Sequence, residues 1–136
     1  MIHQAIDDDG TLRFVAGLYE LREELWERAV ERRIRVVAVT GELDMAGARA
    51  FEETLLECVS GREPTILDLS QVSFMDSTAI GAMLAVRRQA ELKPGRFAVV
   101  CEPGSEIERT LLYMGLDVAF SIVPSRARAA AELANA

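Results

Sequence analysis

The chain has 136 residues, of which 50% are hydrophobic and 27% are charged, and its formal net charge at pH 7 is -7. This length fits one domain with a packed core, and the acidic balance argues against nucleic-acid binding, which requires a basic surface. No apolar run approaches the ~20 residues of a membrane-spanning helix, and residues 1–10 lack the basic and apolar regions of a secretion signal. We therefore expect a cytoplasmic protein that binds neither nucleic acid nor membrane.

Residue types that bind metals or act as catalytic bases are scarce in this sequence. Cys58 and Cys101 show no metal-binding spacing, and we expect them to be reduced, buried thiols. His3 is the one histidine, so the sequence offers no His-based metal site and no Ser-His-Asp triad. The sequence therefore predicts no metal site, no cofactor and no enzymatic activity.

The N-terminal part of the chain predicts one strand and one helix. Residues 11–15, TLRFV, form a short strand-like run after a DDDG turn. Residues 17–32 place apolar side chains at helical spacing, with charged residues between them, which predicts an amphipathic helix. The apolar positions of this helix are Leu18, Leu21, Leu25 and Ala29.

We assign residues 1–33 to an N-terminal extension and residues 34–136 to the main domain. The apolar face of the helix predicted over residues 17–32 must be covered by other apolar surface. We expect this helix to pack on its own domain, and a homodimer formed through it is the alternative.

A strand, a turn and a helix are expected next. Residues 34–40, IRVVAVT, are rich in β-branched residues and predict a strand, which a GELD turn at residues 41–44 follows. Asp44 is expected to be the N-cap of a helix that runs to about Ser60 and stops at Gly61. The buried stripe of this helix is expected to comprise Phe51, Leu55, Cys58 and Val59.

The middle of the chain continues the pattern of strands and helices. Residues 65–69, TILDL, are nearly all apolar, as in a central strand with both faces covered. A helix is expected from about Thr78 to Ala90, and residues 96–101, RFAVVC, predict another buried strand. We expect four further side chains to be packing residues: Phe74, Met75, Met114 and Leu116.

Capping signals define the last elements. Ser105 and Glu108 form a capping box for a helix that ends at Gly115. Residues 119–123, AFSIV, predict a last strand, and Ser125 is expected to cap the closing helix.

The alternation of strands and helices predicts an α/β fold. We expect a single layer of mainly parallel β-sheet with one mixed edge, packed by about four helices, plus the extra N-terminal helix. Ser77 then lies between the carboxyl end of a central strand and the start of the next helix. Open α/β sheets place their functional groups at this edge.

Three blocks of the sequence, in this order and at these distances, resemble a STAS domain: VVAVTGELDMAGA, TILDLSQVSFMDSTAIGAML and MGLDVAFSIV. They are similar, more closely, to the bacterial anti-sigma factor antagonists, and the resemblance covers residues 34 to 134. The middle block follows the family pattern apolar-D-S-[ST]-G-[LIV]-G, which runs here from Met75 to Gly81. The resemblance implies a STAS-like fold and a protein that regulates transcription by binding another protein.

The resemblance also implies a role for Ser77. In this family, the serine after the aspartate is phosphorylated by a serine kinase that is itself the anti-sigma factor, and by position that serine is Ser77. The unphosphorylated form binds the kinase and frees a sigma factor, and phosphorylation switches this binding off. From residue chemistry alone, Ser77 or Asp76 is a helix cap, and a helix start also accepts a phosphate. Thr78 is a second candidate acceptor.

We assign partner binding to five residues around this serine. Glu42 and Asp44 belong to the GELD turn, which a parallel topology brings to the same sheet edge. Asp76 and Thr78 flank Ser77, and Gly81 ends the family pattern. A turn-and-cap role is the alternative for Glu42 and Asp44.

Ala79 stands where the family usually has glycine. If that position needs glycine for backbone shape or for close approach of a kinase, phosphorylation is impaired here. If it lies in the first helical turn, alanine is harmless and is even the better helix former. We favour the second interpretation.

Two other functions compete with the phosphorylated antagonist. One is an accessory STAS subunit of a transporter or sensory complex that acts without phosphorylation. The other is an enzyme with Ser77 as nucleophile, which would need an activating base that the sequence does not place nearby.

Overall fold

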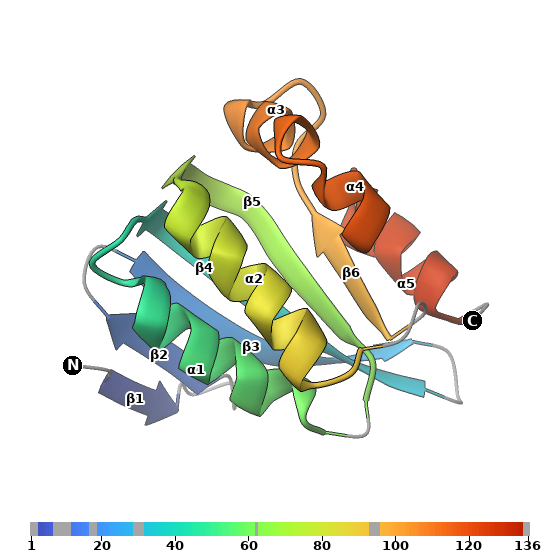
Figure 1. The fold of residues 1–136 in the computed structure, drawn as a ribbon. Coiled ribbons are helices and arrows are strands. Elements are labelled where there is room, and N and C mark those ends of the chain that lie inside the picture. Colours follow the sequence, from blue (N-terminus) through green and yellow to red (C-terminus); the bar gives the residue numbers. More distant parts are fainter. Residues whose placement is uncertain are drawn as a thin grey trace.

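The computed structural model describes residues 3–6, 12–16, 19–28, 32–61, 63–92 and 96–134. These residues form one seven-stranded sheet packed by helices on both faces (Figure 1). The strands are β1 (His3–Ile6), β2 (Leu12–Ala16), β3 (Tyr19–Arg28), β4 (Arg32–Leu43), β5 (Thr65–Met75), β6 (Phe97–Val100) and β7 (Ser121–Val123). The helices are α1 (Ala48–Val59), α2 (Ser77–Gln89), α3 (Glu106–Tyr113), α4 (Leu116–Ala119) and α5 (Arg126–Ala134).

The strands lie side by side in their order along the chain, from β1 to β7. Strands β1 to β4 pair with their neighbours in antiparallel fashion, and strands β4 to β7 pair in parallel. Each parallel connection passes through one or more helices, as parallel strands require. The predicted α/β fold with parallel strands and a mixed edge is confirmed, and the antiparallel part extends over β1 to β4.

The core has two parts because both faces of the parallel strands are buried. On one face, α1 and α2 lie side by side over the sheet (Figure 1), and α3 and α4 extend the same cluster. On the other face, α5 packs on alternate residues of β4, β5 and β6, such as Ile34, Ile66 and Ala98. Residues 65–69 are buried throughout, as predicted for a central strand.

The helix predicted over residues 17–32 is wrong where the structure describes this segment. Tyr19–Arg28 forms β3, and β4 already begins at Arg32. The local pattern favoured a helix, but β3 pairs with β4 from Tyr19↔Gly41 to Arg28↔Arg32. This long antiparallel ladder outweighs the modest propensity difference between helix and strand. A homodimer formed through that helix therefore has no basis in residues 19–28.

The turn predicted at residues 41–44 is also corrected. β4 continues through Leu43, with a register shift after Gly41, whose φ of 108° favours glycine. α1 starts only at Ala48, and its N-cap is Gly47, so Asp44 does not cap it. The predicted buried stripe of this helix is confirmed for Phe51, Leu55, Cys58 and Val59.

Strand β5 is longer than predicted and changes its burial pattern near its end. Its last residue, Met75, is buried as expected, but Phe74 is 48% exposed. Leu116 is buried, whereas Met114 is 46% exposed. The predictions of packing roles for Phe74 and Met114 are therefore wrong.

The caps predicted at Ser105 and Ser125 are confirmed, but the capping box is incomplete, because Glu108 accepts from Gly104 and not from the N–H of Ser105. The Ser105 hydroxyl accepts a bond from the backbone N–H of Glu108 at 3.1 Å, and the Glu108 side chain accepts from the N–H of Gly104 at 3.0 Å. Ser125 accepts from the N–H of Arg128 at 3.1 Å at the start of α5. Gly115, at φ 76°, ends α3, and the short helix α4 follows.

Candidate functional site: the start of helix α2

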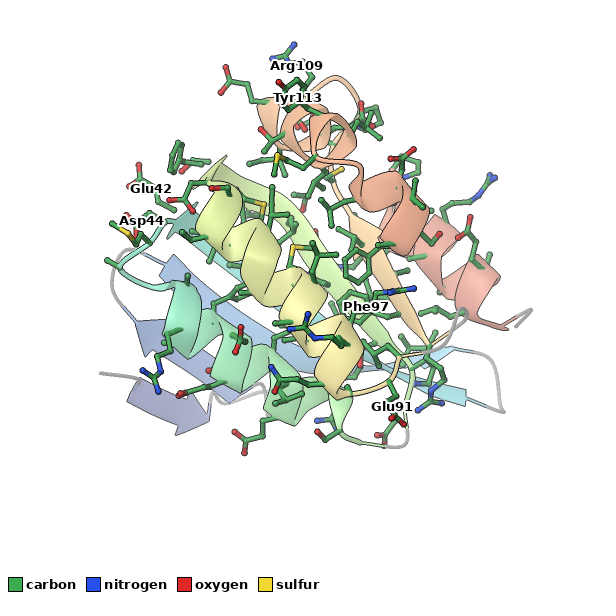
Figure 2. The ribbon with its side chains drawn as sticks, in the orientation of Figure 1. Glu42, Asp44, Glu91, Phe97, Arg109 and Tyr113 are labelled. Carbon is green, nitrogen blue, oxygen red and sulfur yellow. The ribbon has the colours of Figure 1, made fainter. Side chains whose placement is uncertain are left out.

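The predicted site residues come together at one edge of the sheet. Glu42 and Asp44 lie at the end of β4, and Asp76 connects β5 to α2. In the parallel register, Glu42 is the partner of Phe74. Figure 2 shows Glu42 and Asp44 at the end of the sheet where α2 begins, as the parallel topology predicts.

Asp76 is the N-cap of α2. Its backbone is extended, and its Oδ1 accepts hydrogen bonds from the N–H groups of Thr78 at 3.0 Å and Ala79 at 3.3 Å. The sequence left Asp76 and Ser77 open as the cap, and the structure assigns this role to Asp76. Ser77 is instead the first residue of the helix.

The Asp76 carboxylate also binds a second segment of the chain. Its Oδ2 accepts a hydrogen bond from the N–H of Met45 at 3.1 Å, and the Asp76 N–H donates to the carbonyl of Leu43 at 3.2 Å. Asp44 shapes the same turn, because its Oδ1 accepts from the N–H of Ala46 at 3.0 Å. The turn before α1 is therefore fixed to the start of α2.

These hydrogen bonds set the charge of Asp76. Partial burial raises the pKa of this carboxyl, but the bonds that it accepts from Thr78, Ala79 and Met45 outweigh burial and hold the pKa below its ordinary value of 3.8. A fixed negative charge therefore stands beside Ser77 at neutral pH.

The two hydroxyls at the start of α2 differ in their environment. The Thr78 hydroxyl donates to the Asp76 carboxylate. The Ser77 hydroxyl is exposed and has no hydrogen-bond partner among the residues that the structure describes. Of the two candidate acceptors, Ser77 is the one whose hydroxyl no described side chain holds in a fixed orientation.

Ala79 lies in the first turn of α2 and is fully buried. Its backbone is helical, so nothing there calls for the conformational freedom of glycine. The interpretation that alanine is compatible with the fold at this position is confirmed.

Gly81 lies one turn after Ser77 and is exposed. A Cβ atom built on it would meet no heavy atom within 4 Å, and its φ is not positive. Glycine inside a helix costs roughly 1 kcal/mol relative to alanine. Among the residues that the structure describes, no close contact or backbone conformation offsets this cost.

Apolar side chains are exposed around the start of α2, and the sequence did not predict them. Met45 is 75% exposed, Phe74 is 48% exposed and Leu84 is 40% exposed. An aromatic residue after an apolar run is usually a core residue, so the sequence contains no clear signal for the exposure of Phe74. Exposed apolar side chains beside polar ones are typical of protein interaction sites.

Two other features were considered as functional regions: a surface hollow, which lies away from the start of α2, and a membrane-spanning helix, which the described residues do not form. A surface hollow lined by residues 59–61, 90–92 and Arg96 lies at the far ends of α1 and α2. Figure 2 places Glu91 there, away from Glu42 and Asp44. None of the helices seen in the structure combines the length and the apolar composition needed to cross a membrane.

Comparisons with known proteins agree with this architecture. Two similar proteins from Mycobacterium tuberculosis, strains CDC 1551 / Oshkosh and H37Rv, are both named anti-sigma-F factor antagonist RsfB. Each is 34% identical over 91 residues, which covers 65% of this chain and 72% of the relative.

Solved structures of similar fold bear related names. The crystal structure of an anti-sigma factor antagonist from Mycobacterium paratuberculosis superposes with a TM-score of 0.67 and 26% identity, covering 83% of this chain and 93% of that one. The anti-sigma factor antagonist SpoIIAA in its unphosphorylated form has the same fold, with a TM-score of 0.61 and 21% identity over 84% of this chain and 97% of its own.

The family model of the STAS domain matches residues 6–129. The match begins inside residues 1–33, which the sequence pattern favoured as an N-terminal extension, and strands β2 and β3 of that segment are part of the common sheet. The match covers most of the chain, and we conclude that this protein belongs to the STAS domain family.

Proposed function

We propose that this protein is an anti-sigma factor antagonist regulated at Ser77. Its unphosphorylated form binds an anti-sigma factor that is also a serine kinase, and this binding releases a sigma factor. Phosphorylation of Ser77 by the kinase ends the interaction. The observation that carries the proposal is the exposed hydroxyl of Ser77 at the first position of α2, which no other described residue binds.

The relatives support the general role of the chain. The similar Mycobacterium tuberculosis proteins and the Mycobacterium paratuberculosis structure are named as anti-sigma factor antagonists. SpoIIAA, which shares the fold, has also been solved in a phosphorylated form. The choice of Ser77 comes from the family resemblance, and the geometry of this chain supports it, because the neighbouring Thr78 hydroxyl is already bound to Asp76.

Electrostatics explains why a phosphate would end binding. A phosphoserine carries about -1.5 to -2 charges at pH 7. It would stand next to the Asp76 carboxylate, which binds the backbone N–H of Met45, and three residues after Phe74; the Met45 and Phe74 side chains are both exposed. A partner that buries these apolar side chains would have to desolvate the new charge, which is costly.

The same geometry favours binding over catalysis, and we propose that the protein is not an enzyme. A serine nucleophile needs a base within hydrogen-bond reach to take its proton. Within the described part of the chain, no side chain accepts a hydrogen bond from Ser77.

The test is phosphorylation by the anti-sigma factor serine kinases encoded in the same genome as this chain. Each kinase is incubated with the purified protein and Mg-ATP, and the products are mapped by peptide mass spectrometry. We expect one phosphate on Ser77, its loss in Ser77→Ala and its retention in Thr78→Ala. The assignment is contradicted if the phosphate is found on Thr78 alone. It is also contradicted if kinases that phosphorylate another antagonist add no phosphate to this protein.

A further inference from the structure

The exposed face of α2 contains a glycine that the fold does not require. Gly81 lies in the middle of Ser77–Gln89, in ordinary helical backbone, and a Cβ atom there would point into open space. Alanine at this position would therefore make a more stable helix without touching any neighbour. Nothing among the described residues accounts for the glycine, which points to a contact with another protein.

The position of Gly81 relates it directly to the phosphorylation site. Residues three and four apart share one face of a helix, so Ser77, Gly81 and Leu84 form one stripe along α2. All three are exposed. Gly81 is about 6 Å along the helix axis from Ser77, at 1.5 Å per residue. A protein that encloses the Ser77 hydroxyl in its active site therefore covers Gly81 as well.

We infer that the serine kinase packs directly against the backbone of α2 at Gly81, so that any side chain at position 81 holds it away from Ser77. The inference rests on the proposed function and adds a contact that sets how closely the kinase can approach. Glycine in helices is used where another backbone or side chain must come close. Leu84, next on the stripe, supplies apolar surface to the same contact.

The experiment compares Gly81→Ala and Gly81→Leu with the parent, using the kinase that modifies Ser77. Binding is titrated without ATP, so that Ser77 stays unmodified, and the initial rate of phosphorylation is measured separately. Gln89→Leu is the matched control, because it places the same leucine on the same helix about 12 Å beyond position 81 and about 18 Å from Ser77 along the axis.

We expect Gly81→Ala to raise the melting temperature by roughly 3–5 °C, because a helix interior prefers alanine. The same change should weaken kinase binding about tenfold, and Gly81→Leu about hundredfold or more, because overpacking a close contact costs energy that grows with side-chain size. The rate of Ser77 phosphorylation at low kinase concentration should fall in the same order, and Gln89→Leu should change neither quantity by more than about twofold.

Two results would overturn the inference while leaving the proposed function intact. One is that the Gly81→Leu variant binds the kinase as tightly as the parent does and is phosphorylated on Ser77 at the parent's rate. The other is a lower melting temperature for Gly81→Ala, which would reveal a structural need for glycine. If no kinase modifies Ser77 in the parent, the proposed function fails and the inference fails with it.

Discussion

At the scale of single residues, the Asp76 carboxylate stabilises two segments at once. Oδ1 caps α2, and Oδ2 accepts the N–H of Met45. Asp76→Ala should lower the free energy of unfolding by about 1–2 kcal/mol, the upper range for loss of an N-cap. Asp76→Asn keeps an oxygen for the cap but loses the acceptor for Met45, so it should cost only about 0.5–1.5 kcal/mol. Urea denaturation measures the free energy of unfolding of both variants. If Asp76→Asn loses as much stability as Asp76→Ala, the stabilisation comes from the bond to Met45 and not from the cap.

Ser77 contributes little to stability because it does not cap the helix. Ser77→Ala should change the free energy of unfolding by less than about 0.5 kcal/mol. Ser77→Asp should be equally mild, because a negative charge in the first turn interacts favourably with the helix dipole. It should nevertheless abolish kinase binding, as we propose that phosphorylation does. Thermal melts and a binding titration on the same samples test this, and unfolding of Ser77→Asp would mean that phosphate acts by breaking the fold.

Asp68 links β5 to α5 and makes stability dependent on pH. Burial raises the pKa of this carboxyl, but its bonds to Ser70 and to Arg126, at 2.6 Å, together with the arginine charge, hold the pKa below 3.8. A lowered folded-state pKa gives stability that is present above about pH 4 and is lost as the pH falls below it. Between pH 7 and pH 2.5, the melting temperature of Asp68→Asn should fall less than that of the parent. The control variant Asp117→Asn, at an exposed site, should lose as much as the parent.

At the scale of elements, α5 alone among the described helices covers the second face of the sheet. Leu133 is 1% exposed in a cluster with Ile34, Ile66 and Val100. Leu133→Ala should therefore lower the free energy of unfolding by about 2–5 kcal/mol. Leu84→Ala, at a 40% exposed site on α2, is the control and should cost under about 1 kcal/mol. Similar losses for the two variants in urea denaturation would mean that α5 is not part of the cooperative core.

Which elements the sequence could predict depended on whether the deciding interactions were local. Ser105 and Ser125 cap helices through residues three positions away, so their helices were predictable. The end of β4 was not predictable, because Gly41 and Leu43 are held by parallel pairing with β5, about thirty residues later in the chain. At the site, the sequence pointed to Ser77 through the family resemblance, and this assignment stays a prediction. The sequence could not tell that Asp76 caps α2, since Met45 helps to fix that carboxylate.

At the scale of the whole molecule, the antiparallel edge was the main failure of prediction. β3 has the composition of a helix, YELREELWER, but its apolar residues Tyr19, Leu21 and Leu25 also share the odd positions of a strand. Both periods fit, and only the pairing with β4, along ten residue pairs, decides between them. Long-range pairing is invisible to local patterns.

This edge gives a prediction about association. β3 is charged at six of its ten positions, whereas β4, RRIRVVAVTGEL, is apolar over most of its centre. Charged residues protect an open sheet edge from pairing with other chains, and an exposed apolar edge invites it. Deletion of residues 1–18 leaves β3 as the edge and should give a less stable but monomeric protein.

Deletion of residues 1–31 removes β3 and uncovers the unpaired backbone groups along β4. This variant should form dimers or larger aggregates at concentrations at which the shorter deletion remains monomeric. Light scattering with size-exclusion chromatography measures both. If the two variants are equally monomeric, β3 does not serve to protect β4, and the ladder between them contributes stability alone.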